Sequence, residues 1–231
     1  MITVVSTLAL TSGGFFMALR EFESERDQYV SSVLSLTSLV AIGLVFLYAL
    51  APSFWNRMTG LPTHLMILLL VGLLVAPARD FWLSRQRFEY RYKLSGAVTI
   101  VSAVAASGLA VVAVLYANSI DFSDIASVRL FANYSIVYGV AAVIWFSIFL
   151  KGKCFYSSKY WKFSLQLSLP LIGYSIASQI LSVSDRLMIS KMVGNSAVGV
   201  YSTLYTVSSL SLMVWTAINA CLLYTSDAAD D

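Results

Sequence analysis

Charged residues are scarce in this sequence, and their scarcity restricts its class. Only 12% of its 231 residues are Asp, Glu, Lys or Arg, whereas about 25% is usual for a soluble domain. Hydrophobic residues make up 58%, so the chain has too few polar side chains to cover a soluble globule. The formal net charge of +3 is too small a basic excess to indicate a nucleic acid partner, and we expect none.

The residues that build catalytic and metal sites are also few. The chain has one histidine and two cysteines, Cys154 and Cys221, whose wide separation indicates neither a disulfide framework nor a metal site. Carboxylates do not cluster within the apolar segments, so a nucleophilic triad and a metal hydrolase both lack parts. We therefore expect no enzymatic activity, no cofactor and no metal.

The sequence contains seven long runs without a charged residue. A helix needs about 20 apolar residues to cross a bilayer, and strict polar/apolar alternation typical of membrane strands is absent. The sequence therefore predicts an all-α, polytopic membrane protein with about seven transmembrane helices. The runs are Met1–Leu19, Gln28–Asn56, Met58–Ala78, Leu94–Ile120, Leu130–Leu150, Phe163–Ser184 and Met192–Ser226.

Basic residues are distributed unevenly between the loops that join the runs: every second loop is rich in them. Three loops contain most of the Lys and Arg, and such loops are typically cytoplasmic. We therefore expect these three on the cytoplasmic side and Met1 outside. The three loops contain Arg20 and Arg26, then Arg79, Arg85, Arg87, Arg91 and Lys93, then Lys151, Lys153, Lys159 and Lys162, while the other side has Arg57, Arg129, Arg186 and Lys191.

Small residues four apart characterise the run from Leu94 to Ile120. Ser102, Ala106 and Ala110 would share one helix face. Such faces let helices approach closely in lipid. We interpret this face as a packing seam, with a wall facing substrate as the alternative.

Uncharged hydroxyl side chains are frequent in the last two runs. They can return their hydrogen bonds to the helix backbone, or they can line a hydrated cavity, and the sequence leaves both interpretations open. Pro170 in the sixth run would loosen the backbone hydrogen bonds around it.

Ionisable residues interrupt the apolar sequence at two places. Arg79 and Asp80 close the third run, and Asp185, Arg186 and Lys191 close the sixth. Ionisable groups within spans usually face a cavity and indicate function. At helix ends they can instead anchor the helix by reaching toward the lipid headgroups. Both interpretations stay open here.

The segment LPLIGYSIASQILSVSDRLMISKMVGNSAVGVYSTLYTVSSL, residues 169–210, resembles the seventh and eighth helices of the polysaccharide flippases. These proteins belong to the multidrug/oligosaccharidyl-lipid/polysaccharide exporter superfamily. The shared pattern is a leucine-proline entry, an Asp-Arg pair, a basic residue, a glycine and then avGiYs. The places of this pattern are filled by Asp185, Arg186, Lys191, Gly194, Gly199 and Tyr201. FWLSRQRFEYRYKLSG and FFMALREFESERDQYVSS are similar to two cytoplasmic loops of the family, and the resemblance covers nearly all of residues 1–220.

The resemblance implies part of a two-lobe exporter fold, lacking the first helix and the C-terminal helices. Residues 1–150 would form helices 2–6 in the N-terminal lobe, and residues 151–162 a basic cytoplasmic connector. Residues 163–222 would form helices 7 and 8, the start of the C-terminal lobe. We expect residues 223–231 to be an artefactual tail, because CLLYTSDAADD resembles a translated sequencing-adapter read-through.

Members of the family are understood to move undecaprenyl-pyrophosphate-linked oligosaccharide from the inner to the outer leaflet by alternating access. The resemblance therefore implies a lipid-linked oligosaccharide substrate and a place in the lipid bilayer of the bacterial cytoplasmic (inner) membrane. It also implies a part in surface polysaccharide synthesis, such as that of the lipopolysaccharide O-antigen, with a polysaccharide polymerase and assembly proteins as possible partners.

The chemistry of that substrate suggests roles for the ionisable residues. A sugar headgroup needs a hydrated path, and a pyrophosphate needs cations. We hypothesise that Arg186 and Lys191 hold the anionic headgroup near the outer mouth, with Asp185 orienting Arg186. Arg79 and Arg87 are the candidates on the cytoplasmic side.

Three other functions remain open. A cation-coupled multidrug or metabolite antiporter of the same superfamily would carry an acidic coupling site in its first lobe, and none is visible in the first five runs. A membrane-bound glycan ligase or acyltransferase would need a catalytic histidine or an arginine-rich outer loop, whereas the outer loops here are short and poor in bases. The third is a non-transporting scaffold of a polymer assembly complex.

Overall fold

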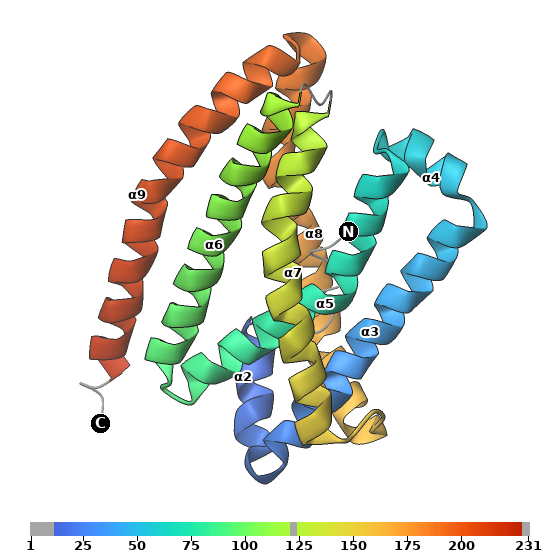
Figure 1. Cartoon of the computed structure of the whole chain (residues 1–231). Coiled ribbons are helices and arrows are strands. Elements are labelled where there is room, and N and C mark those ends of the chain that lie inside the picture. The colour runs from blue at the N-terminus through green and yellow to red at the C-terminus, as the bar shows by residue number, and fades with distance from the viewer. Residues whose placement is uncertain (1–11, 121–123, 228–231) are drawn as a thin grey trace. The chain divides into compact units, whose positions relative to one another are not determined.

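The computed structural model describes residues 12–120 and 124–227, and within these ranges the chain is helical with no strand (Figure 1). It divides into two compact units, Met1–Ile176 and Ala177–Asp231, which we describe separately. The prediction of an all-α fold is confirmed. The predicted lobes, connector and artefactual tail stay predictions, and residues 228–231 of that tail lie outside the described ranges.

The helices follow one another with short connections. Four segments are long and apolar enough to cross a membrane: Glu23–Leu50, Thr63–Phe88, Tyr92–Ser119 and Ile125–Gly152. They confirm a polytopic membrane protein, whereas the remaining three spans stay predictions, and the first of these falls largely outside the described residues. The elements are α2 (Ser12–Glu21), η1 (Glu23–Glu25), α3 (Arg26–Leu50), α4 (Pro52–Thr59), α5 (Thr63–Phe88), α6 (Tyr92–Ser119), α7 (Ile125–Gly152), α8 (Ser158–Met192) and α9 (Asn195–Asp227).

The placement of ionisable residues at helix ends is wrong at two places. Helix α5 continues through Arg79 and Asp80 as far as Phe88, and α8 continues through Asp185 to Met192. The charges do not end these helices, because the residues that follow them include several good helix formers, namely Arg, Leu, Gln and Lys. Helix α5 ends instead beside Tyr90, whose φ of 57° is left-handed and incompatible with a continuing helix.

The boundary between the second and third runs is also corrected. Pro52 lacks an N–H and cannot continue α3, but it suits the first turn of a new helix, so α4 begins there. Helix α4 ends at Gly60, where φ is 71°, a conformation that glycine adopts without steric cost. The junction of the two runs thus contains a short helix that hydropathy alone does not reveal.

Helix α7 packs against α3, α5 and α6 in the first unit. On α6, Ser102, Ala106 and Ala110 are only 5%, 2% and 7% exposed. These small side chains let α6 approach its neighbours closely. The prediction of a packing seam is confirmed at these three positions.

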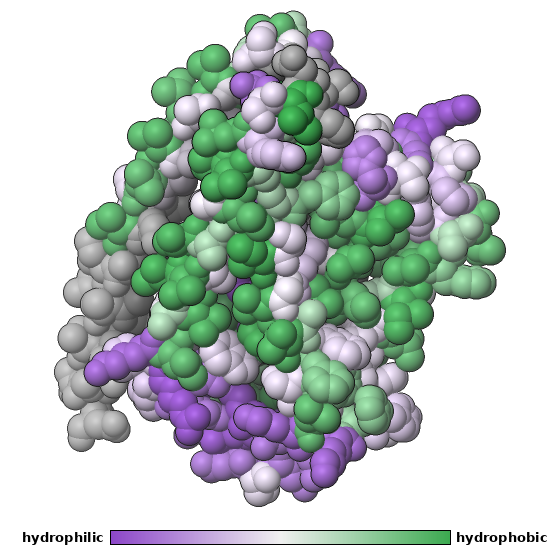
Figure 2. All heavy atoms as spheres, in the orientation of Figure 1, coloured by the Kyte–Doolittle hydropathy of each residue, from purple (hydrophilic) through white to green (hydrophobic). Residues whose placement is uncertain are grey.

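The three basic segments of the sequence meet at one end of the first unit, here called the basic end (residues 20–28, 85–93 and 151–162). Arg85 forms an ion pair with Asp27, and Lys159 lies 3.5 Å from Glu25. Figure 2 shows hydrophilic residues gathered at this end and hydrophobic residues along the helix flanks. The predicted sharing of one side by these loops is confirmed, while the assignment of that side to the cytoplasm stays a prediction.

The start of α8 is held against η1 and α3 by three hydrogen bonds, here called the α8 anchor. The Tyr160 hydroxyl donates to Glu25 Oε2 at 2.6 Å, and Trp161 Nε1 donates to the Ser32 carbonyl at 2.9 Å. The hydroxyls of Tyr29 and Ser164 lie 2.8 Å apart. Burial raises the pKa of Tyr160 to about 12, so its hydroxyl keeps the proton that it donates. The predicted basic connector is therefore attached to the first unit.

The Tyr29–Ser164 bond gives a test of the α8 anchor. Tyr29→Phe should lower the free energy of unfolding by about 1–3 kcal/mol, because the buried Ser164 hydroxyl loses its partner. The double variant Tyr29→Phe/Ser164→Ala should recover most of that loss, since no buried polar group is left unpaired. Thermal unfolding in detergent measures both, and equal losses in the single and double variants would contradict the bond.

Gly152 gives a test of the contact between α7 and α3. A Cβ at this position would overlap the Asp27 carbonyl oxygen and the Ser31 Cβ. Gly152→Ala should therefore destabilise the protein by about 1–3 kcal/mol, the usual cost of overpacking. Gly139→Ala on the same helix is the control, because a Cβ there has nothing within 4 Å and should not lower the unfolding temperature.

Candidate functional site

Arg79 and Gln86 place unpaired polar atoms on one face of α5. They are seven residues apart, close to two helical turns, so they lie on the same side of the helix. Arg79 Nε and Gln86 Oε1 are both buried and have no protein partner among the described residues. Buried polar atoms are normally hydrogen-bonded, so the Arg79 N–H suits an anion or a water molecule, whereas the Gln86 oxygen suits a water molecule that donates to it. Arg79 is thus a cation inside a helix rather than at its end.

Asp80 lies next to these cations. It is exposed and interacts electrostatically with Arg79 and with Arg87. Both arginines therefore carry a neighbouring negative charge, although neither forms an ion pair among those found in the described part of the chain. The two candidates that we predicted on the cytoplasmic side share one helix and one neighbouring carboxylate.

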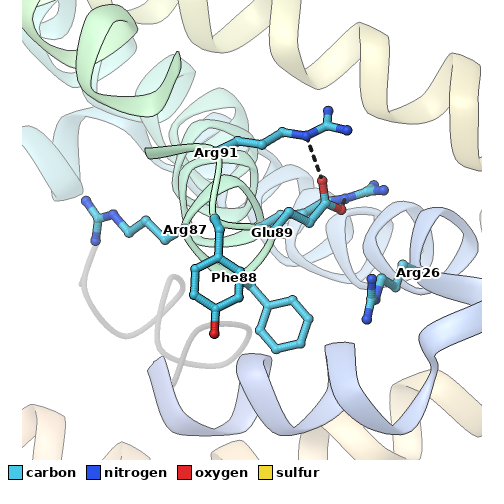
Figure 3. A pocket seen from close by; sticks show the side chains of 7 residues that line it. Arg26, Arg87, Phe88, Glu89 and Arg91 are labelled. Carbon is cyan, nitrogen blue, oxygen red and sulfur yellow. Dashed lines mark hydrogen bonds and ion pairs between the residues drawn. The ribbon is translucent and has the colours of Figure 1, made fainter. Parts of the chain in front are cut away.

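An open hollow at the basic end is lined by four arginines (Figure 3). Arg85 Nε lies 2.7 Å from Glu89 Oε1, and Arg91 lies 3.8 Å from the same carboxylate. These two guanidinium groups therefore already interact with a carboxylate of the protein. The hollow is lined by Arg26, Arg85, Arg87, Phe88, Glu89, Tyr90 and Arg91.

Arg26 is bound as well. Its Nε donates to the Leu19 carbonyl at 3.0 Å, and its guanidinium lies 5.0 Å from the centre of the Phe88 ring. Arg87 differs, because Figure 3 shows its side chain extending away from Glu89 and Arg91. Arg87 is therefore the arginine of this hollow that the fold leaves most available to an anion.

The second unit brings the Asp-Arg pair of α8 against two tyrosines of α9. The Tyr201 hydroxyl donates to Asp185 Oδ2 at 3.2 Å, and the Arg186 guanidinium carbon lies 5.1 Å from the centre of the Tyr205 ring. Gly194 allows this contact, because its φ of 113° reverses the chain between the two helices.

The contacts of the pair differ from the expected ones. No ion pair within the described residues joins Asp185 to Arg186, and the orienting role of Asp185 stays a prediction. Tyr201 contacts Asp185, and Tyr205 contacts Arg186. Sequence reasoning gave Tyr201 no role and missed Tyr205, although their spacing of four residues places both on one helix face. Lys191, one turn further along α8, is exposed.

Several hydroxyls of α9 bond to the backbone of their own helix. Thr203, Thr206 and Ser209 each donate to a carbonyl three or four residues earlier, as does Ser184 on α8. For these side chains the backbone interpretation is the one that the structure supports. A hydrated cavity lined by other hydroxyls stays a prediction.

Comparison with known proteins agrees with this architecture. A family profile described as "Polysaccharide biosynthesis protein" matches residues 10–224. None of the curated proteins and none of the solved structures compared with the chain matches it. Because the profile covers almost the whole chain, the protein belongs to the polysaccharide biosynthesis family.

Proposed function

We propose that the protein is a transporter, not an enzyme, that flips undecaprenyl-pyrophosphate-linked oligosaccharide across the bacterial cytoplasmic membrane by alternating access. One combined observation carries this proposal: the chain belongs to the polysaccharide biosynthesis family, and it contains helices that are long and apolar enough to cross a membrane. A polysaccharide precursor made on one side of a membrane and used on the other needs such a path. The oligosaccharide would serve surface polysaccharides such as the O-antigen.

The positions of the cations support an anionic headgroup. Arg79 Nε is buried and has no partner in the part of the chain that the structure describes, and Arg87 extends away from the carboxylate that binds its neighbours. Arg186 lies on an aromatic ring, a contact that leaves its N–H donors free. Guanidinium groups bind phosphate oxygens in a bidentate geometry, so free arginines suit a pyrophosphate.

Deletion of the gene tests the proposed function. The deletion strain should lose its surface polysaccharide and accumulate lipid-linked oligosaccharide on the cytoplasmic side of the membrane. Measuring both separates transport from synthesis, because a synthetic enzyme would leave no complete intermediate. Loss of surface polysaccharide without accumulation of the lipid-linked form would contradict a flippase.

Charge reversal at Arg186 tests the anion site. Arg186→Glu, introduced at the chromosomal gene, should reduce export at least about tenfold, because a carboxylate repels the pyrophosphate and a lost charge-assisted hydrogen bond costs about 1.5–3 kcal/mol. Arg129→Glu, at an exposed position near the start of α7, is the matched control and should leave export unchanged. Immunoblotting checks that protein levels are equal. Normal export with Arg186→Glu would remove this residue from the site.

The ring of Tyr205 gives a finer test. Tyr205→Leu should lower export several-fold, since a cation–π contact contributes about 0.5–2 kcal/mol to holding Arg186. Tyr205→Phe keeps the ring and should export normally. Equal export by the Leu and Phe variants would show that stacking on the ring is not needed.

A further inference from the structure

Helix α4 lies between two membrane-crossing helices and has two chemically different sides. It connects the end of α3 to the start of α5, away from the basic end (Figure 1). Phe54 and Met58, four residues apart on one face, are 60% and 71% exposed. Ser53 and Arg57 are also exposed, on a face about 100° round the helix. Two large apolar side chains thus lie beside a polar face.

Polar bonds to both neighbouring helices fix the orientation of α4. Asn56 Nδ2 donates to Thr63 Oγ1 at 2.8 Å, and Asn56 Oδ1 accepts from the Tyr48 hydroxyl at 3.2 Å. Trp55 Nε1 donates to the Leu47 carbonyl at 3.2 Å. Because the inward side of α4 is held at these points, the exposure of Phe54 and Met58 belongs to a defined surface.

That surface continues the lipid-facing side of α3. Phe46 and Leu50, in the last turns of α3, are 65% and 67% exposed. Figure 2 shows hydrophobic residues along this flank up to the corner between α3 and α4, with hydrophilic residues beyond it. Since α3 and α5 both cross the membrane, the helix between their ends is confined to the membrane surface.

We propose that α4 lies flat in the membrane surface, with Phe54 and Met58 inserted between lipid headgroups and acyl chains. Amphipathic helices bind in this way when an apolar face meets the acyl boundary and a basic face meets water. Ser53 and Arg57 then lie on the aqueous side, where Arg57 can reach lipid phosphates. The helix fixes the depth of the α3–α5 hairpin in the bilayer. This inference does not depend on what the protein transports.

Fluorescence quenching at four positions tests the proposal. Single-cysteine variants Ser53→Cys, Phe54→Cys, Arg57→Cys and Met58→Cys would be made in a Cys154→Ser/Cys221→Ser background and labelled with an environment-sensitive fluorophore. The whole chain is reconstituted in vesicles of phosphatidylethanolamine and phosphatidylglycerol. One quencher is iodide in the water, and the other is a nitroxide near the top of a lipid acyl chain.

Labels at 54 and 58 should be quenched by the nitroxide about twofold more than labels at 53 and 57, with the reverse order for iodide. Equal iodide quenching at all four positions would overturn the proposal, because α4 would then stand in water. Protection of 54 and 58 from both quenchers would also overturn it, since protein would then cover the face. Size-exclusion chromatography identifies the folded variants. The comparison needs only one folded variant at an apolar position (54 or 58) and one at a polar position (53 or 57).

Discussion

The first turns of α3 join the first unit together, because α5, α7 and the start of α8 all bind there. Asp27 pairs with Arg85 of α5, and Ser31 lies against Gly152 of α7, where there is no room for a Cβ. The Ser32 carbonyl and the Tyr29 hydroxyl bond to the start of α8. Van der Waals packing and hydrogen bonds hold helices together in lipid, where the hydrophobic effect gives little drive for association. The polar and small residues at this end of α3 supply both.

This arrangement has a consequence for how the two units connect. A charged segment such as residues 151–162 suggests a loose linker by composition alone. Its aromatic residues instead make it part of the first unit: Tyr160 is 4% exposed and packs against Phe22 and Tyr29. Lys159 lies 4.8 Å from the centre of the Phe22 ring. Any movement of the second unit therefore begins beyond the α8 anchor.

The sequence predicted the class of fold well because that class depends on local composition. Uncharged runs predict helices, and the face of Ser102, Ala106 and Ala110 predicts a seam, from spacing alone. Helix α4 was missed because the count of uncharged residues does not register that the chain turns at Pro52 and begins a new helix. The Tyr29–Ser164 bond joins residues 135 positions apart, which periodicity cannot reveal. The same holds for Tyr205 on Arg186, a contact that depends on the reversal at Gly194.

The structure also separates cations that hold the fold from cations that remain available. Arg85 is bound by two carboxylates, which occupy the donors that a phosphate would need. A neighbouring aromatic ring fixes Arg186 differently, because it attracts the charge without accepting its N–H hydrogen bonds in the plane. A transporter of the kind proposed must bind its headgroup and then release it, so a positioned guanidinium with no ion pair among the described residues suits that task better than one buried in ion pairs. By this reasoning Arg186 is the strongest of the candidate residues, and Arg85 is structural.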